Sequence, residues 1–277
     1  MRANNEAMAP GEPAIIGQLP TISLDELNAL AGLQTRIDRK YVLTAEQADR
    51  ALSVVSGRLS ALEIDGLRSF QYNSLYFDTP ELISYRAAAT RRRRRFKVRV
   101  RHYVDSGVSA LEVKTRGGRG ETVKTRADGA PDYCNGFTPE TLRYIDSTVE
   151  TEGLARHLQS MMWTAYNRST IVDLDDRSRI TIDRCLRGSP AGGSWRVLTD
   201  RVIVETKSTD RTTPLDRALW ADHIRPVAIS KYAIAMALHH PWLPANRWSR
   251  VLREHFACAT TRPQVLATVT STVDQSV

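Results

Sequence analysis

Charged and apolar side chains alternate from Arg95 to Arg101 in the segment RRRFKVRVRHY at residues 93–103. In a β-strand, successive side chains point to opposite faces. One face of this segment would carry Arg95, Lys97, Arg99, Arg101 and Tyr103, and the other Phe96, Val98, Val100 and His102. The chain must therefore fold so that one face of a sheet is apolar and the other strongly cationic.

The same alternation recurs in four further segments. Their charged members are Glu112, Lys114 and Arg116; Lys124 and Arg126; Arg177, Arg179 and Asp183; and Glu205 and Lys207. A half-buried sheet with one solvated face is the simpler interpretation of any single segment. However, like charges that face one another across strands destabilise a sheet unless an anion lies between them. Five such segments favour a sheet that curls and directs its cations toward one axis.

Strands dominate the predicted elements. We expect strands at 35–43, 70–77, 93–103, 109–116, 121–126, 162–174, 178–184 and 201–207. Helices are expected from the cap at Thr44 to Gly57, at about 138–161, at 213–221 and at 230–239. Many strands with few crossover helices indicate an α+β protein built on an antiparallel sheet or β-barrel with flanking helices.

The 277 residues suffice for one large domain or two small ones. Residues 1–20 are rich in Ala, Pro, Gly and Asn, and residues 258–277 in Thr, Val and Ser. We therefore expect a flexible leader at 1–20 and a flexible tail at 258–277. No linker or internal repeat divides the rest, so residues 21–257 are expected to form a single domain.

The net charge of +8 favours a polyanionic partner, whether nucleic acid, an anionic membrane surface or a phosphate compound. The cysteines Cys134, Cys185 and Cys258 form no CxxC pair, which argues against a zinc site or disulfide framework. This cysteine usage fits a reducing, cytoplasmic location. No apolar run reaches the ~18 to 20 residues of a membrane span.

Arginine guanidinium groups present a fork of donors that matches phosphate oxygens. Converging arginines and lysines would thus suit an extended phosphate polymer. Among the few acids, Glu205 is the favoured ligand for Mg²⁺ or Mn²⁺, with Glu112, Asp183 and Asp38 as lesser candidates. For Glu112 and Asp183, an internal ion pair with a neighbouring cation is the preferred interpretation.

Nine short stretches occur in the order RIDRKY (36–41), SLYFDT (74–79), RVRHY (99–103), LEVKTR (111–116), VKTR (123–126), YNR (166–168), RITID (179–183), VIVETK (202–207) and SKY (230–232). Together they resemble the VTC domain, the polyphosphate polymerase module of the vacuolar transporter chaperone complex, which belongs to the triphosphate tunnel metalloenzymes (CYTH superfamily). The resemblance covers about residues 34–240 and implies an antiparallel β-barrel tunnel.

The resemblance also implies roles for individual residues. The expected catalytic set is Arg99, Arg101, Arg168, Arg179 and Lys231, the phosphate-binding set is Lys40, Lys114, Lys124, Arg126 and Ser230, and the metal ligand is Glu205. Arg36 and Asp38 stand where the superfamily's ExExK signature has glutamates, a departure that the VTC branch shares. This departure places a second carboxylate-held metal in doubt.

The implied reaction is transfer of a phosphoryl group from a nucleoside triphosphate, ATP, to a polyphosphate chain, with Mn²⁺ or Mg²⁺ as cofactor. A separate membrane-protein partner is also implied. The alternatives are a triphosphatase or polyphosphatase with the same tunnel, and a non-catalytic polyphosphate or nucleotide sensor. The run Arg91–Arg95 raises nucleic acid as a further alternative, which we do not expect because only 7% of residues are aromatic. These arginines would instead guide a polyanion to a tunnel mouth or lie in solvent.

Overall fold

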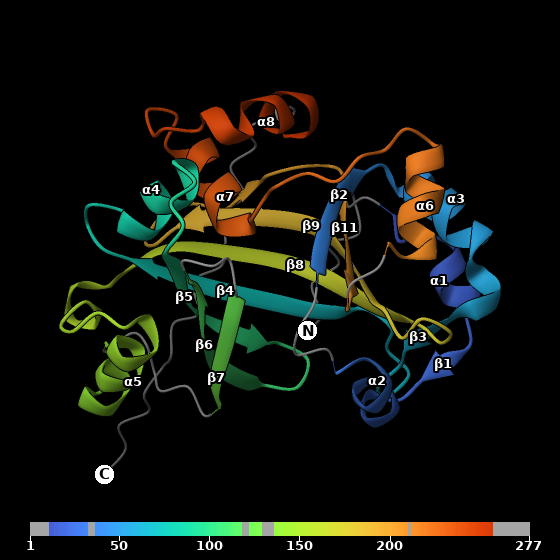
Figure 1. Cartoon of the computed structure of the whole chain (residues 1–277), viewed down its shortest axis with the longest axis horizontal. Coiled ribbons are helices and arrows are strands. Elements are labelled where there is room, and N and C mark those ends of the chain that lie inside the picture. Colours follow the sequence, from blue (N-terminus) through green and yellow to red (C-terminus); the bar gives the residue numbers. More distant parts are fainter. Residues whose placement is uncertain (1–10, 33–36, 118–121, 129–135, 210–211, 257–277) are drawn as a thin grey trace, which may run out of the picture.

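A single curled sheet organises the chain, for which a computed structural model describes residues 11–32, 37–117, 122–128, 136–209 and 212–256. Its main path runs β2-β11-β9-β8-β4-β5-β6-β7, and every neighbouring pair along it is antiparallel. These strands are β2 (Ile37–Leu43), β11 (Val202–Ser208), β9 (Arg179–Pro190), β8 (Gln159–Asp173), β4 (Phe70–Asp78), β5 (Arg95–Tyr103), β6 (Val108–Arg116) and β7 (Thr122–Asp128). Long strands β4, β8 and β9 cross the middle of the molecule (Figure 1).

Three short strands extend this sheet at its margins. β3 (Leu59–Leu62) pairs with β8, β1 (Thr21–Ile22) pairs in parallel with β3, and β10 (Arg196–Val197) pairs with β9. The expected α+β fold with a curled antiparallel sheet and flanking helices is confirmed, in the form of a half-barrel. Within the described residues, the end strands β2 and β7 do not pair with each other. Instead, side chains approach across the opening, where Lys114 Nζ lies 3.8 Å from Asp38 Oδ2.

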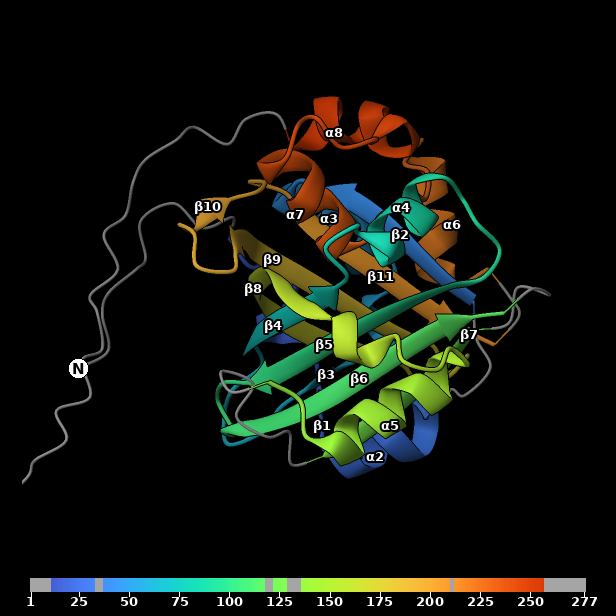
Figure 2. The same cartoon turned by 90° about the vertical axis from the view of Figure 1, so that its left-hand side faces the viewer.

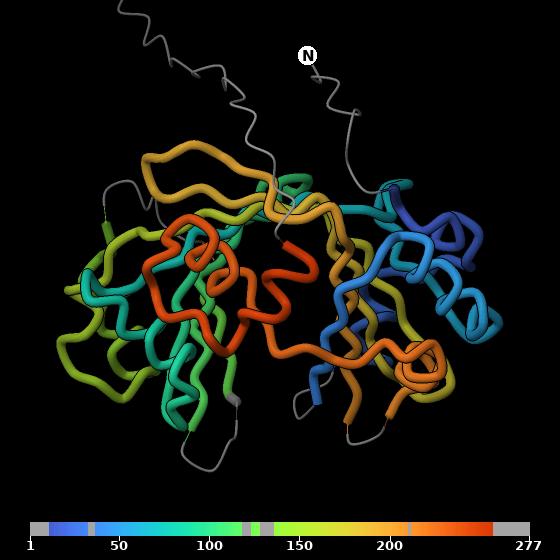
Figure 3. Tube along the Cα trace, turned by 90° about the horizontal axis from the view of Figure 1, so that it is seen from above, coloured from blue at the N-terminus to red at the C-terminus, as the bar shows by residue number. Residues whose placement is uncertain are grey.

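Helices flank both faces of the sheet. They are α1 (Ile15–Gln18), α2 (Leu24–Ala31), α3 (Ala45–Val54), α4 (Ile83–Ala89), α5 (Pro139–Val149), α6 (Pro214–Ala221), α7 (Lys231–His239) and α8 (Ser249–His255), with 3-10 turns at Ser56–Arg58, Ala155–His157 and Asn246–Trp248. α5 lies against β5 and β6 (Figure 2), whereas α3 and α6 lie on the side of β2 and β11. Seen from above, the C-terminal helices lie between these two sides (Figure 3).

The alternation in the sequence decides which face each side chain occupies. Val98, Val100 and Val113 are fully buried and pack with Ile145 of α5 in one hydrophobic cluster. Burial of these side chains is the main favourable term in fixing the strands, at roughly 1.5 to 3 kcal/mol for each large aliphatic group. Because strand side chains alternate, the intervening lysines and arginines must point to the concave face.

Helix boundaries agree with the sequence where a capping residue is present. Thr44 caps α3 in a capping box with Gln47, as expected, but the helix ends at Val54 rather than Gly57. The helix expected at 138–161 is wrong beyond Val149. Glu150 and Gly153 adopt positive φ values of 56° and 73°, which end the helix. A 3-10 turn follows, and β8 begins at Gln159.

The expected leader at residues 1–20 is partly folded, which corrects that prediction. Ile16 of α1 and Leu19 are buried in the cluster under α3, with 1% and 4% of their surface exposed. Burial of these apolar side chains holds the segment against the core, although its composition is typical of a flexible leader. Residues 1–10, Arg36, Cys134, Cys258 and the expected tail lie outside the described residues. Among the described helices, none combines the length and apolarity that a membrane crossing requires.

Candidate functional site

A cavity of about 500 Å³ lies on the concave face of the sheet. Among the described residues, its charged lining comprises eleven cations and three carboxylates: Lys40, Lys97, Arg99, Arg101, Lys114, Lys124, Arg126, Arg168, Arg179, Lys207 and Lys231, with Asp38, Glu112 and Glu205. These side chains come from β2, β5, β6, β7, β8, β9, β11 and the start of α7. The cavity is therefore a strongly positive compartment assembled by the curl of the sheet.

Every lysine of the 277-residue sequence lines this cavity. The chain has six lysines, Lys40, Lys97, Lys114, Lys124, Lys207 and Lys231, and all six are lining residues. The remaining basic residues are arginines, most of which lie elsewhere. The concave face is thus chemically different from the outer surface as well as more highly charged.

All eleven site residues predicted from the sequence lie around this cavity. They are Arg99, Arg101, Arg168, Arg179 and Lys231; Lys40, Lys114, Lys124, Arg126 and Ser230; and Glu205. The structure therefore brings together segments that are up to about 190 positions apart in the chain, while their individual roles remain predictions. By contrast, Arg95, Arg116 and Arg177 are not lining residues, although they continue the alternating pattern.

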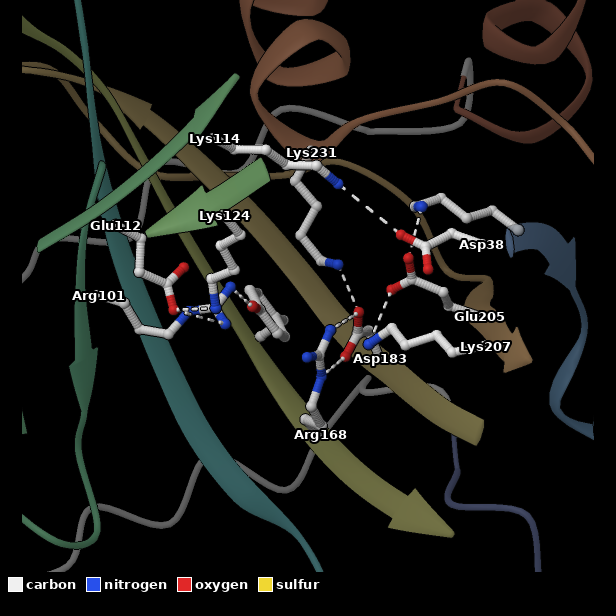
Figure 4. Close-up of polar contacts among 12 residues, drawn as sticks. Asp38, Arg101, Glu112, Lys114, Lys124, Arg168, Asp183, Glu205, Lys207 and Lys231 are labelled. Atoms are coloured by element: carbon white, nitrogen blue, oxygen red, sulfur yellow. Dashed lines mark hydrogen bonds and ion pairs between the residues drawn. The ribbon is translucent and has the colours of Figure 1, made fainter. Parts of the chain in front are cut away.

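Glu112 organises the cations of β5 and β7. It is 2% exposed, and its carboxylate accepts hydrogen bonds from Arg99 Nε at 2.7 Å and Lys124 Nζ at 2.7 Å. Arg101 Nη1 lies 3.8 Å away. Burial alone would raise the pKa of Glu112, but the three cations outweigh it and hold this pKa well below its usual range. Glu112 is therefore a permanent anion that fixes three cations, of which Arg101 and Lys124 are labelled in Figure 4.

Asp183 plays the same part for β8 and α7. Arg168 donates to its two oxygens from Nε at 2.6 Å and from Nη2 at 2.7 Å. Lys231 Nζ also donates to Asp183 Oδ2. Burial opposes ionisation, but these two cations lower the pKa of Asp183 below its usual range. Both ion pairs confirm the preferred interpretation of Glu112 and Asp183 as internal partners of cations.

Tyrosines hold the guanidinium groups from the other side. The Tyr72 and Tyr166 rings stack with centroids 5.5 Å apart, and the guanidinium carbons of Arg101 and Arg168 lie 5.2 and 5.3 Å from the Tyr72 centroid. Arg101 Nη2 donates to Tyr166 Oη at 2.9 Å. These cation–π and hydrogen-bond contacts orient the arginines before any ligand arrives.

The model of the VTC domain family matches residues 35–240, and these residues contain every strand that lines the cavity. The chain belongs to the VTC domain family. This membership supports a function connected with polyphosphate or triphosphate compounds. No curated protein matches the chain.

Two solved structures are similar to this VTC-domain chain. One is a candidate adenylate cyclase from Bacillus halodurans, with 14% identity, a TM-score of 0.48 and coverage of 71% of this chain and 94% of the other. The second is a Hippeastrum protein, a candidate adenylyl cyclase described by a dominant triphosphatase activity, with 15% identity, a TM-score of 0.46 and coverage of 76% and 99%. At these identities and TM-scores, neither bears on the function of this chain.

The carboxylates of this VTC domain would hold a divalent metal only if a bound phosphate compound supplied further oxygen ligands. Glu205 accepts from Lys40 Nζ at 2.6 Å and lies 3.6 Å from Lys207 Nζ, and these cations hold its pKa well below the usual range despite its burial. Asp38, on the neighbouring strand β2, lies beside Glu205 and stands opposite Lys207 in the strand register. No group of three or more potential ligands occurs in the described part of the chain. Two carboxylates plus phosphate oxygens are nevertheless a common magnesium environment.

Four residues that line or flank the cavity of this VTC domain were missed as site residues by sequence reasoning. Lys97 and Lys207 share the alternating pattern, which therefore identifies them. Lys207 also ends the stretch VIVETK, whereas Lys97 lies outside all nine family stretches. Tyr72 and Tyr166 also line or flank the cavity. Alternation along β4 and β8 gives no signal for these tyrosines, because a tyrosine fits either face of a strand.

Proposed function

We propose that this chain is a polyphosphate polymerase-like phosphotransferase, which moves the terminal phosphoryl group of ATP onto a polyphosphate chain within the cavity. One observation carries the proposal: eleven cations from eight separate elements surround one cavity that has only three carboxylates among its described lining residues. Such an arrangement is stable when a polyanion supplies the missing negative charge. A chain of linked phosphates has the required charge density and needs no base-stacking surface.

In the proposed reaction, an oxygen of the terminal phosphate of the polymer attacks the γ-phosphorus of ATP. The new P–O bond extends the polymer by one phosphate, while the bond between the γ-phosphorus and the β–γ bridging oxygen breaks and ADP leaves. Arg99, Arg101, Arg168 and Arg179 would hold the equatorial oxygens, and Lys114, Lys124 and Lys231 would hold the flanking phosphates. Positioning and charge stabilisation account for most of the catalysis in this class of reaction.

Buried carboxylates would serve as positioning residues in this mechanism. Glu112 and Asp183 are almost fully buried, so the cations that they bind cannot swing away from the cavity. Bound Mn²⁺ or Mg²⁺ would neutralise charge on the β- and γ-phosphate oxygens. Glu205, together with Asp38, would hold that ion. Lys40 and Lys207 would then turn from Glu205 to the phosphates.

The test is incubation of the purified chain with ATP and Mn²⁺, followed by separation of the products on a polyphosphate gel. We expect a polymer ladder from the unmodified chain and at least about a 100-fold lower rate for Lys231→Ala and Glu205→Ala, as is typical for loss of one charge-stabilising group. Arg50→Ala, on exposed α3, is the matched control because it removes a cation remote from the cavity. A rate that is unchanged in Lys231→Ala would contradict the proposal.

The same experiment separates the alternatives. Release of orthophosphate from added tripolyphosphate, with no polymer, would identify a triphosphatase or polyphosphatase. Binding without turnover would identify a sensor. This alternative is favoured by the ion pairs of Glu205 with Lys40 and Lys207, because they engage the carboxylate that would hold the metal. We further propose a cytoplasmic location and a separate membrane-protein partner. Full polymer synthesis without membranes would show that such a partner is not obligatory.

A further inference from the structure

Four arginines gather just outside the cavity. Arg95 is the first residue of β5 and stands opposite Arg116, the last residue of β6. Arg91 belongs to the turn after α4, and Arg247 to the 3-10 turn Asn246–Trp248. We call these four residues the mouth arginines. They come from three regions of the chain that the fold brings together.

The mouth arginines continue the cationic face of the cavity. Lys97 and Lys114 line the cavity and stand opposite each other on β5 and β6. Arg95 and Arg116 lie two residues further along the same strands, and so point to the same face, roughly 7 Å beyond the lysines. Lys114 also approaches Asp38 at the start of β2. The mouth arginines therefore lie at the end of the cavity where β2 and β5 begin.

The backbone of α4 fixes the outer two members of the group. Arg247 Nη1 donates to the carbonyl oxygen of Ala88 at 2.8 Å, and the Arg91 N–H reaches the same oxygen at 3.4 Å. The neighbouring Trp248 is 3% exposed and packs on Tyr85 of α4, with ring centroids 5.7 Å apart. This anchoring holds the group in place even though Arg91 itself is exposed.

Negative charge is missing from this group. None of the four side chains forms an ion pair with a carboxylate of the described residues. Burial lowers the pKa of Arg95, and Arg116 and Arg247 lower it further. Burial likewise lowers the pKa of Arg247, with Arg91 and Arg116 adding to the effect. Arg247 Nε is also buried without a hydrogen-bond partner. Four mutually repelling cations without a counter-charge suit an anionic ligand.

We propose that the mouth arginines form a second polyanion subsite, which binds phosphates of a polyphosphate chain where it leaves the cavity and makes affinity depend on chain length. This inference rests on the proposed function of the cavity. A phosphate polymer fits better than nucleic acid because the aromatic side chains next to Arg95 and Arg247 in sequence, Phe96 and Trp248, are 8% and 3% exposed and offer no face to a base.

Binding of two ligands to the full chain tests the proposal. Tripolyphosphate is short enough for the cavity alone, whereas long-chain polyphosphate would reach both sites. We expect the unmodified chain to bind the long chain more tightly. In Arg116→Gln/Arg247→Gln, long-chain affinity should fall by about tenfold or more, since two charge-assisted contacts with phosphate are lost. Tripolyphosphate affinity should change by less than about twofold.

The matched control is Arg50→Gln/Arg217→Gln, which removes two exposed arginines from α3 and α6 with the same change in net charge. Arg116→Gln alone changes only an exposed position, so it keeps the test valid if the loss of Arg247 prevents folding. An equal loss for both ligands, or an equal loss in the control, would overturn the second subsite. Displacement of the long chain by single-stranded RNA at equal phosphate concentration would overturn the assignment to polyphosphate. Failure of the unmodified chain to bind tripolyphosphate would instead overturn the proposed function.

Discussion

Lys97 differs from the other cavity cations in its surroundings. Arg95 and Arg99 flank it on the same face of β5, Lys114 faces it from β6, and Lys40 approaches from β2. Burial first, and then these cations, lower the pKa of Lys97 to about 7. In contrast, Lys40 has a raised pKa because the attraction of Glu205 outweighs its burial. The free protein therefore holds one cavity lysine largely neutral above pH 7.

Binding of tripolyphosphate should therefore take up a proton at Lys97. Between about pH 7 and 10, the free amine is mostly neutral, and a bound anion favours its charged form. Calorimetry at pH 8 in two buffers with different ionisation enthalpies should give an uptake approaching one proton. Lys97→Arg, which stays charged at every pH, is the control and should lower the uptake. An identical uptake in both proteins would contradict the assignment to Lys97.

The lowered pKa of Lys97 also makes the free energy of unfolding depend on pH. Because the folded-state pKa of Lys97 is below the ordinary value of 10.5, the unfolded chain binds more protons between about pH 10 and 7. The free energy of unfolding from this group therefore falls as the pH decreases through that window. The loss is complete below about pH 7, where both states are protonated.

At the scale of single elements, α7 combines a structural and a proposed functional residue at its first turn. Ser230 caps the helix by accepting from the Ala233 N–H at 3.2 Å, and it also lines the cavity. The next residue, Lys231, donates to Asp183 on β9. Thr213 caps α6 in the same way, but it is buried away from the cavity. A comparison of the two caps can therefore distinguish the loss of a helix cap from the loss of a hydroxyl group that lines the cavity.

Ser230→Ala and Thr213→Ala should each lower the free energy of unfolding by about 1 kcal/mol, the usual contribution of an N-cap side chain. Only Ser230→Ala should also weaken tripolyphosphate binding, because Ser230 lines the cavity and Thr213 does not. Denaturant unfolding and calorimetric binding on both variants measure the two effects. If Thr213→Ala weakened binding as much as Ser230→Ala, the effect would come from helix stability rather than from a contact with phosphate.

Five of the strands that carry the cavity, β5, β6, β7, β9 and β11, could be predicted because one physical rule, alternation between an apolar core and a charged face, governs them. Val98 and Arg99 are assigned to opposite faces by that rule alone. This rule does not predict short elements such as α4. The carboxylate of Asp78 stabilises α4 by accepting hydrogen bonds from the N–H groups of Ser84 and Tyr85, both at 2.9 Å. Asp78 lies six positions before Ser84 rather than at the N-cap, and the N-cap residue Leu82 provides no side-chain acceptor, so the usual capping pattern does not mark the start of α4.

At the site, the sequence predicts which cations converge but not how they are held. Residues that share the period-2 pattern or a family motif, such as Arg99 and Lys231, were found. The pairing of Lys231 with Asp183 joins positions 48 apart through two different elements. The mouth arginine Arg247 could not be predicted either, because its turn is placed by contacts with α4, where Trp248 packs on Tyr85 and Arg247 donates to the carbonyl oxygen of Ala88.

Across the whole molecule, the concentration of positive charge in one cavity affects stability. Mutual repulsion among the lining cations opposes folding, since they exceed the lining carboxylates by a wide margin. Carboxylates such as Glu112 relieve only the cations that they touch. A bound polyanion would relieve the remainder and would bind only the folded chain.

Tripolyphosphate should accordingly raise the thermal midpoint of unfolding. At a concentration 100-fold above its Kd, the free energy of unfolding should increase by about 2.7 kcal/mol. Sodium chloride at equal ionic strength is the control, and it should give a smaller increase through screening alone. Thermal unfolding followed by circular dichroism would measure both. Equal increases in the two salts would mean that the cavity has no specific affinity for polyphosphate.

The placement of all six lysines inside the cavity also determines how the protein responds to amine chemistry. Acylating dyes, amine-reactive cross-linkers and lysine-acetylating enzymes find no ε-amino group on the outer surface of this chain. Any ε-amine adduct must therefore form inside the compartment and remove a positive charge there. A labelling step aimed at surface amines would therefore act on this protein by lowering the positive charge of the cavity.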